Sequence, residues 1–379
     1  MTDLLQSLRV LDLSRVLAGP LCTMMLGDLG AEVIKVERQG TGDETRGWGP
    51  PFDERGESAY YLSVNRNKKS VVADLDREVD RTMIIDLARG ADVVVDNFRR
   101  GTLEKRGIDP EMLLRENTRL IWCTITGFGS GSDRLGYDLV VQAESGWMSI
   151  TGEPTGDPLR VGVALADIIA GKDAAIAILG ALAARGLRDG PLELTQRRIH
   201  ISLAHSATAA LINVAQNSLV TGADAKRWGN QHPNLVPYQL FHAADRPMIV
   251  AVGTDAQWIA CANALGLDDL ARDSSLASNA GRLAARDRIV DAVAKRLAER
   301  ESREWIAILG AKGVPCGVVN SVLDALDNVE TSPLTGIAPS VPGSVRLPPP
   351  RLDEQGAAIR RDGWRVFEGS IPQRPDELH

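Results

Sequence analysis

The chain has 379 residues, more than one hydrophobic core usually organises, so we expect two domains. Apolar residues make up 44% of it and aromatic residues only 4%, which predicts a large core built from aliphatic side chains. The formal net charge of −7 argues against nucleic acid or an anionic membrane surface as the main partner.

The cysteines and histidines do not suggest a disulfide framework or a metal site. Four cysteines are scattered without a CxxC pair, and the five histidines show no HExxH or similar spacing, so we expect no bound metal and a reducing compartment. The N-terminus has no basic segment followed by an apolar one, and no run of 18 apolar residues occurs in the sequence. We therefore expect a cytoplasmic protein with no membrane partner.

The first 200 residues alternate short β-branched runs with helical stretches. Because apolar strands interleaved with helices are typical of parallel sheets covered on both faces, we predict a large Rossmann-like α/β domain over residues 1–200. Strands are predicted at 8–13, 31–37, 70–73, 92–96 and 119–126, and helices at 20–29, 77–89 and 170–185.

The remaining residues predict a second, smaller α/β domain. A strand at 198–203 and a helix at 204–219 precede a stretch rich in Gly, Asn and Pro at 221–238. Residues 247–325 combine an apolar strand with several helices, and much of the proline follows them. We divide the chain into a large domain, a linker, a small domain and a proline-rich segment that returns to the large domain: 1–200, 201–224, 225–325 and 326–379.

Familiar nucleotide-binding and hydrolase motifs are absent from the sequence. The first strand-to-helix turn is SRVLAGP instead of GxGxxG, so Glu37 after the second strand has no glycine-rich cradle for a dinucleotide beside it. Neither GxxxxGK[ST] nor GxSxG occurs. Ser202 and His205 could form a hydroxyl–imidazole pair, but both lie in an apolar run that favours core packing.

Asp167 is an unusual acidic residue, because every neighbour from Val161 to Ile169 except Gly162 is apolar. Burying a lone carboxylate in such a segment is costly unless the carboxylate is satisfied or used. One interpretation is an N-cap for the helix that begins just after it. The other is a nucleophile that the helix amides hold as an anion, and the two interpretations are compatible.

Nine motifs occur in an order that is more informative than any one of them. They are LRVLDLSRVLAGP at 8–20, LGDLGAEVIKVE at 26–37, GDETRGWGPPF at 42–52, YYLSVNRNKKS at 60–70, DNFRRG at 96–101, ITGFG at 125–129, GYDLVVQAESG at 136–146, ALADIIAG at 164–171 and GVPCGVVN at 313–320. Together they resemble the class III CoA-transferase family, of the formyl-CoA and carnitine-CoA transferase type, over nearly the whole chain. The succinyl-CoA:glutarate CoA-transferase branch is the most similar.

The resemblance implies an enzyme that moves CoA between carboxylic acids without a cofactor, CoA itself being a substrate. Asp167 would attack the acyl-CoA thioester, giving a mixed anhydride and then an aspartyl-CoA thioester. Water must be kept from these intermediates, so apolar surroundings for Asp167 and a lid that includes Gly253 are implied. An interlocked homodimer is implied as well. The implied CoA contacts are Arg15, Val16, Ala18, Arg38, Lys69, Asn97, Phe98 and Lys105.

Tyr137 bears on the choice between this activity and a related one. The α-methylacyl-CoA racemases share the fold but use a histidine–aspartate pair, with the pattern GHD where this chain has Gly136-Tyr137-Asp138. Tyrosine, with a pKa near ~10, is a poor base at neutral pH compared with imidazole near ~6.5. Racemase-like isomerisation is therefore disfavoured. A non-catalytic acyl-CoA-binding relative, in which Asp167 is only a cap, is the third alternative.

A dicarboxylic substrate would require a cation for its second carboxylate, ideally a bidentate arginine. Arg46, Arg160 and Arg227 are the candidates. One stretch departs from the family pattern: DGPLELTQRRIHISL at 189–203 has His200 where aspartate is usual.

Overall fold

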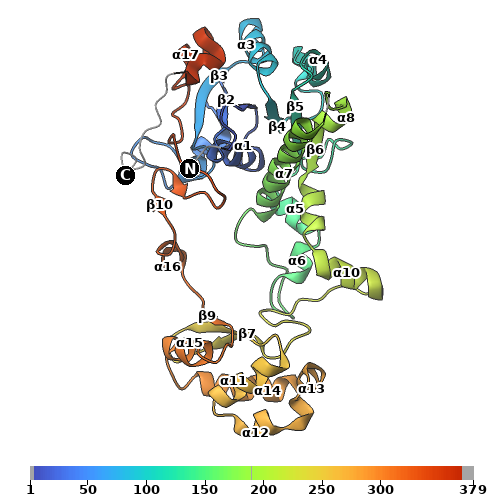
Figure 1. Cartoon of the computed structure of the whole chain (residues 1–379), viewed down its shortest axis with the longest axis vertical. Helices are drawn as coiled ribbons and strands as arrows, with labels where there is room; N and C mark the ends of the chain where they lie inside the picture. The colour runs from blue at the N-terminus through green and yellow to red at the C-terminus, as the bar shows by residue number, and fades with distance from the viewer. Residues whose placement is uncertain (1–3, 189, 369–379) are drawn as a thin grey trace. The chain divides into compact units, whose positions relative to one another are not determined.

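The computed structural model describes residues 4–188 and 190–368 (Figure 1). The chain forms two compact units. The first comprises the described residues of Met1–Met148, Arg160–Ala223 and Val329–His379, and the second comprises Ser149–Leu159 and Asp224–Asn328. The short segment 149–159 therefore belongs to the second unit, which the predicted boundary at residue 200 did not anticipate.

A six-stranded parallel sheet forms the centre of the first unit, in the order β3-β2-β1-β4-β5-β6. In this doubly wound topology the strand order reverses between β1 and β4, and the loops there leave a crevice at the carboxyl edge of the sheet. The predicted parallel sheet is confirmed. In sheet order, the strands are Lys68–Ala73, Glu32–Arg38, Arg9–Asp12, Val93–Asp96, Ile121–Thr126 and Arg198–Ser202.

Both faces of this sheet are covered, because successive strand side chains enter two separate apolar clusters. One cluster joins Val10, Val33 and Val95 to helices α1 (Ala18–Asp28) and α7 (Leu165–Leu187). The other joins Leu11, Ile34, Val94 and Trp122 to α3 (Glu78–Arg89) and α4 (Pro110–Glu116). Helix α7 also begins five residues earlier than the predicted 170–185.

Shorter helices complete the first unit. The helix predicted at 204–219, inside the segment 201–224 assigned as a linker, is present as α9 at Leu203–Ala209 and α10 at Ile212–Thr221. The others are α2 (Ala59–Leu62), α5 (Asp138–Glu144), α6 (Trp147–Ile150), α8 (Leu194–Arg197) and the 3₁₀ turns η1 (Glu44–Gly47) and η2 (Glu104–Arg106).

The C-terminal segment packs against the β2–β3 side of the first unit. It carries the small hairpin β10 (Thr331–Ser332) and β11 (Gly336–Ile337), then α17 (Gly356–Asp362) and η4 (Gly363–Phe367). The Asn67 N–H donates to the carbonyl of Leu347 at 2.9 Å, and Trp364 Nε1 donates to the carbonyl of Leu87 at 2.9 Å. The part of the predicted segment beyond residue 368 lies outside the described residues.

The second unit is built on a three-stranded antiparallel sheet in the order β7-β8-β9. Trp258, Trp305, Ile289 and Val250 are buried in its own core. Its strands are Tyr238–His242, Pro247–Ala251 and Cys316–Val318, and its helices α11 to α16 are Asp255–Ala264, Asp268–Arg272, Asn279–Ala284, Arg286–Leu297, Ser302–Gly310 and Val322–Leu326, with the 3₁₀ turn η3 at Ser274–Leu276.

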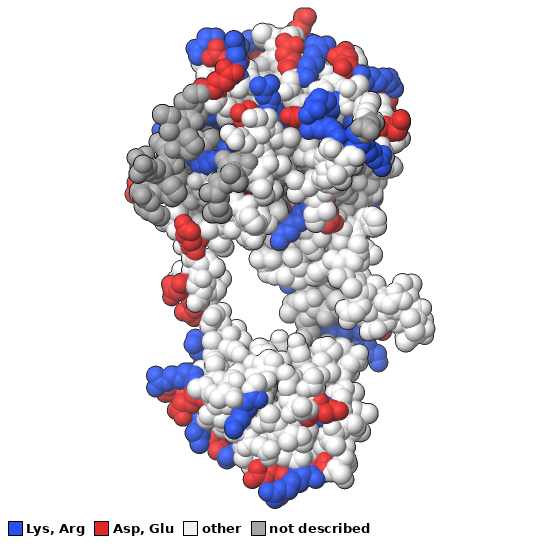
Figure 2. Space-filling view, in the orientation of Figure 1, with Lys and Arg blue, Asp and Glu red and all other residues white. Residues whose placement is uncertain are grey.

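On the face drawn in Figure 2, basic and acidic side chains lie next to one another in several groups, and broad areas between these groups carry no charged residue. Among residues 4–188 and 190–368, no helix combines the length and the apolar character that a membrane crossing requires.

Candidate active site

A cavity of about 580 Å³ lies at the carboxyl edge of the parallel sheet, where the strand order reverses. This is the place where open α/β sheets bind their ligands. All of its walls belong to the first unit. They come from the loops after β1, β4 and β5 and from α7 and β6, and include Arg15, Val16, Ala18, Asn97, Phe98, Tyr137, Asp167, Arg198 and His200.

Asp167 lies in the first turn of α7 and lines this cavity. The helix begins at Leu165, with Ala164 as its N-cap, so the prediction that Asp167 is the N-cap is wrong. The capping function belongs to Asp138 instead, whose Oδ1 accepts a hydrogen bond from the Ala166 N–H at 2.8 Å. Within the described residues, the Asp167 carboxylate itself has no hydrogen bond or ion pair.

The surroundings of Asp167 favour its neutral form. Ala164 and Ile168 on its own helix pack with Leu17 and Tyr60 in a small apolar cluster. Burial, and after it the negative charge of Asp138, raises the pKa of Asp167 to about 7. Burial and the charge of Asp138 therefore outweigh the predicted stabilisation of the Asp167 anion by the helix amides. Tyr60 lies close to both acids. Burial, and after it the negative charges of Asp167 and Asp138, raise the pKa of Tyr60 to about 12.

Asp138 is fixed at the start of α5 by a buried glutamine. Gln142 Nε2 donates to Asp138 Oδ2 at 2.6 Å, while Gln142 Oε1 accepts from the Val161 N–H at 2.9 Å. This glutamine thus ties α5 to the segment that leads into α7. Tyr137, the N-cap residue of α5, is 61% exposed and lines the cavity.

The loop after β1 is joined directly to the loop after β4. The Arg15 N–H donates to Asn97 Oδ1 at 3.0 Å, and Asn97 Nδ2 donates to the Arg15 carbonyl at 2.7 Å. The Arg15 guanidinium lies 5.4 Å from the Phe98 ring centre and 2.7 Å from Glu44 Oε1. The structure thus brings Arg15, Val16, Ala18, Asn97 and Phe98 together around one cavity.

A second cavity of about 610 Å³ adjoins the first and shares Arg15, Phe98 and Arg99 with it. Arg38 lines this second cavity, at the end of β2. Lys105 lies exposed in η2 next to it but lines neither cavity. Sequence reasoning missed Arg99 and Arg100, although both stand in the DNFRRG motif and line the first cavity.

Lys69 lies elsewhere. Its ammonium donates to the Val366 carbonyl at 2.6 Å and lies 4.4 Å from the centre of the Phe367 ring. Both partners belong to the C-terminal segment, and Lys69 lines neither cavity.

Of the three arginines predicted for a distal carboxylate, the structure brings none into the cavity. Arg46 is buried and already paired, with Nε 2.8 Å from Glu37 and Nη1 2.6 Å from Glu57, so its guanidinium is not available to a substrate. Arg160 is exposed and lines neither cavity. Arg227 belongs to the second unit, as does Gly253, and donates to the carbonyls of residues 153 and 156.

Arg198 was missed by sequence reasoning and does line the cavity. Its Nη1 donates to Thr124 Oγ1 at 2.8 Å, and within the described residues it forms no ion pair. His200 follows two positions later on the same face of β6. Side chains alternate between the two faces of a strand, and β6 pairs with β5 so that His200 lies beside Thr124. This alternation could have shown that Arg198 and His200 lie on the same face of the sheet as Thr124.

Across residues 4–188 and 190–368, no group of three His, Cys, Asp or Glu side chains is arranged to hold a metal ion. An unpartnered carboxylate beside apolar groups is suited to act as a nucleophile once it is ionised.

Comparisons with known proteins agree with this geometry. The model of CoA-transferase family III matches residues 5–347. The succinyl-CoA:glutarate CoA-transferase of Mus musculus is 38% identical over 97% of this chain and 88% of its own length. The succinate–glutarate CoA-transferase of Agrobacterium fabrum is 41% identical over 84% of this chain and 80% of its own length.

Solved structures show the same architecture. A CAIB/BAIF family protein from Brucella suis superposes with a TM-score of 0.83 at 37% identity, covering 94% of this chain and 98% of its own. The similarity to the family model, to the mouse relative and to the Brucella suis structure extends over both units. The chain is a member of CoA-transferase family III.

Proposed function

We propose that the protein transfers CoA from succinyl-CoA to a second, dicarboxylic acid, with Asp167 as the nucleophile. The observation that carries the proposal is the Asp167 carboxylate, which lines the cavity at the sheet switch point without a partner among the described residues. The relatives named succinyl-CoA:glutarate CoA-transferase support the choice of donor and of acceptor class.

The reaction takes place in four displacements at carbonyl carbon. An Asp167 oxygen attacks the thioester carbon and the C–S bond breaks. CoA departs as the thiolate, and a mixed anhydride between Asp167 and the donor acid is formed. The thiolate attacks the Asp167 carbonyl, which releases the donor acid and forms an aspartyl-CoA thioester. The acceptor carboxylate then displaces the thiolate, giving a second anhydride. Finally the thiolate attacks the acceptor's acyl carbon and restores the Asp167 carboxylate.

The two adjoining cavities offer room for both ends of CoA. The nucleotide would lie in the second cavity beside Arg38, and the pantetheine arm would pass Arg15 and Phe98 to reach Asp167. Arg99 and Arg100 would meet the phosphates, because guanidinium groups form charge-assisted hydrogen bonds with them. The apolar cluster of Leu17, Tyr60 and Ile168 would keep water from the anhydrides.

Borohydride trapping tests the nucleophile directly. Mixing the protein with succinyl-CoA and then borohydride should reduce the aspartyl thioester to an alcohol, leaving a permanent mass change that maps to residue 167. Asp167→Ala should lose the label and several orders of magnitude in turnover, about 10⁴-fold or more, while still binding CoA. Asp173→Asn, on the same helix, is the matched control and should label normally. CoA binding without any label would favour a non-catalytic acyl-CoA-binding protein.

Arg198 is our candidate for the distal carboxylate of the dicarboxylic acid. It combines partial burial with a guanidinium that makes one hydrogen bond and no ion pair among the described residues. Arg198→Met should raise the KM for dicarboxylic acceptors about 10-fold or more and leave monocarboxylic acceptors unchanged. Arg134→Met is the control, since Arg134 lines the same cavity but is paired with Glu144. Equal losses for both acceptor classes would contradict the assignment.

We also propose a cytoplasmic homodimer. Helix α10 has no buried residue in this chain, and its Ile212, Leu219 and Val220 are 73%, 78% and 76% exposed, which a second copy could cover. All four cysteines are free, in keeping with a reducing compartment. Light scattering on a size-exclusion column gives the oligomeric state, and a monomeric mass at micromolar concentration would contradict the dimer.

A further inference from the structure

The loop between β1 and α1 has a backbone that its own sequence does not favour. Val16 has a φ of +71°, a conformation that a β-branched residue rarely adopts. Strain of this kind persists only where the surroundings hold the backbone in place. The loop forms the wall of the cavity next to Asp167, so whatever holds it also sets the position of that wall.

Two buried lysines hold the loop from inside the protein. Lys35 Nζ donates to the Ser14 carbonyl at 2.9 Å, and Lys68 Nζ donates to the Pro20 carbonyl at 2.9 Å. These carbonyls lie on either side of Val16. Both lysine side chains are wholly inaccessible to solvent, and neither lines either of the two cavities described above, so neither can touch a substrate there.

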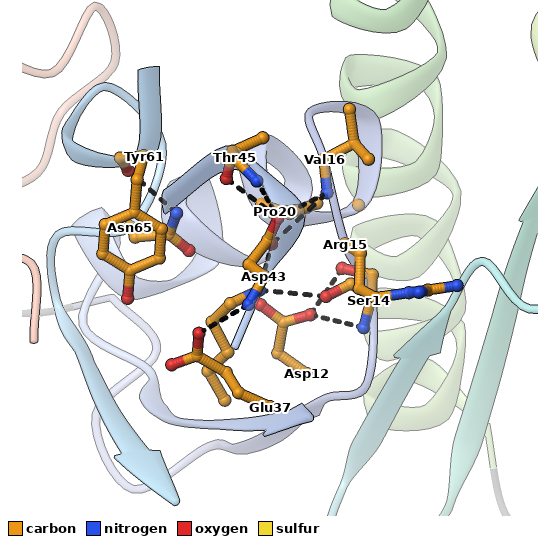
Figure 3. A network of polar contacts seen from close by, with 12 residues as sticks. Asp12, Ser14, Arg15, Val16, Pro20, Glu37, Asp43, Thr45, Tyr61 and Asn65 are labelled. Atoms are coloured by element: carbon orange, nitrogen blue, oxygen red, sulfur yellow. Dashed lines mark hydrogen bonds and ion pairs between the residues drawn. The ribbon is translucent and has the colours of Figure 1, made fainter. Parts of the chain in front are cut away.

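Carboxylates balance both ammonium groups. Lys68 Nζ lies 3.0 Å from Asp12 Oδ2 and also donates to Asn65 Oδ1 at 3.0 Å, so with Pro20 all three of its N–H donors are satisfied. Lys35 Nζ lies 3.0 Å from Asp43 Oδ2. Figure 3 shows Asp12 and Asp43 gathered beside the loop.

Asp43 reaches the strained residue itself. Both of its carboxylate oxygens lie 3.3 Å from the Val16 N–H, which donates to them. The backbone is therefore held at three points: the carbonyls of Ser14 and Pro20 by lysines, and the amide of Val16 by the carboxylate that pairs with one of those lysines.

Stability alone gives a weak reason for this arrangement. Moving two ion pairs out of water is expensive, and apolar replacements of similar size are often as stable or more stable. A parallel sheet could bury valine or methionine at both positions. The network instead fixes the direction of particular peptide groups, which apolar side chains cannot do.

We infer that Lys35 and Lys68 are positioning residues that hold the loop from Ser14 to Leu17 and the first turn of α1, which contains Pro20, so that a thioester in the cavity faces Asp167. This inference rests on the proposed function. It concerns how fast Asp167 is acylated, since a misplacement of about 1 Å can cost roughly 10²-fold in rate.

The test is the single-turnover rate of borohydride labelling with saturating succinyl-CoA. Lys35→Met and Lys68→Met should each label about 10²-fold more slowly than the unmodified protein. Arg66→Met is the matched control. Arg66 is also a buried cation, paired with Asp28 at 2.7 Å, but it donates to the carbonyls of Thr335 and Ile337 instead of the loop. It should lose thermal stability and keep its labelling rate.

A second variant guards against loss of folding. Lys68→Met alone leaves Asp12 buried without its counterion, so Asp12→Asn/Lys68→Met removes both charges together. We expect this double variant to unfold near the temperature of the unmodified protein and still to label slowly. Normal labelling by a folded variant would overturn the inference. Absence of labelling in the unmodified protein would overturn the proposed function instead.

The unmodified protein provides a further readout. Burial lowers the pKa of Lys68 to about 8. The negative charge of Asp12 acts in the opposite direction, and the positive charge of Lys35 lowers the pKa further. Among the described residues, Asp43 also acts on Lys68, and Lys68 acts on the buried Cys22 thiol. The labelling rate should therefore fall as the pH rises above about 8 while the fold remains intact.

Discussion

Asp12 and Asp167 are two carboxylates near the same edge of the sheet, and their surroundings differ. Asp12 accepts hydrogen bonds from the Ser14 N–H at 2.9 Å, Thr23 Oγ1 at 2.7 Å and Lys68 Nζ at 3.0 Å. Burial alone would raise its pKa, but Lys68, Lys35 and these hydrogen bonds hold it well below the usual range. Asp167 has no such partner among the described residues, and its pKa rises to about 7.

The comparison shows that burial by itself does not make a carboxylate reactive. The lone pairs of Asp12 are committed to donors, so this group is a permanent anion that holds structure. The lone pairs of Asp167 remain free for an electrophile, at the cost of a weaker preference for the ionised state. The same edge of the sheet thus carries one acid that fixes the loop and one that can attack.

The first prediction alters the contact between the helices that carry these two regions. A Cβ at Gly171 of α7 would lie 2.6 Å from the Ala18 carbonyl of α1, closer than atoms can pack. Gly171→Val should therefore push α7 away from the loop, lowering kcat about 10²-fold and stability by about 1–3 kcal/mol. Gly180→Val on the same helix, where a Cβ meets nothing within 4 Å, is the control. Unchanged kcat in a folded Gly171→Val protein would show that the close contact does not position Asp167.

The sequence predicts those parts of the contrast between Asp12 and Asp167 that depend on neighbouring residues in the chain. The parallel sheet follows from continuous apolar runs such as Val93–Val95, which only a doubly covered sheet can bury. Asp167 follows from a lone acid in an apolar segment. Both signals are local in the sequence.

The partners of these groups could not be predicted in the same way. Arg46 was a reasonable candidate for a substrate carboxylate until the fold placed Glu37 and Glu57 around it. Asp138 caps a helix that begins 27 residues further on, and such a contact leaves no pattern in spacing. The predicted helix at 204–219 is present as α9 and α10, but the sequence did not show that α10 has no buried residue, because the spacing of apolar residues does not show what covers them.

The second prediction removes the charge that raises the pKa of Asp167. Asp138→Asn keeps an oxygen for the Ala166 N–H but takes away the negative charge that, after burial, favours the neutral acid. The acid limb of kcat/KM against pH, which reports the free enzyme, should have its midpoint near pH 7 in the unmodified protein and at lower pH in the variant. Glu144→Gln, on the same helix α5 but paired with Arg134, should leave the midpoint in place. An unmoved midpoint in Asp138→Asn would mean that another group controls the limb.

The third and smallest effect is on stability, where the two carboxylates should differ in sign. A pKa raised from 3.8 to about 7 means that the folded state binds the Asp167 proton more tightly than the unfolded chain does. The contribution of Asp167 to stability is therefore complete below about pH 4 and is lost as the pH rises through about 7. Asp167→Asn has no such proton to lose.

The inactive Asp167→Asn protein should therefore match the unmodified protein near pH 4 and exceed it above pH 7. Because the site is only partly buried, we expect a gain on the order of 1 kcal/mol, or a Tm higher by about 2–4 °C. Asp12→Asn should behave oppositely, since it removes an anion that Lys68 and Lys35 stabilise, and it should lower Tm at neutral pH. Thermal melts of both variants from pH 4 to 8 measure this difference. A loss of stability in Asp167→Asn at pH 8 would mean that Asp167 is a paired, structural acid like Asp12.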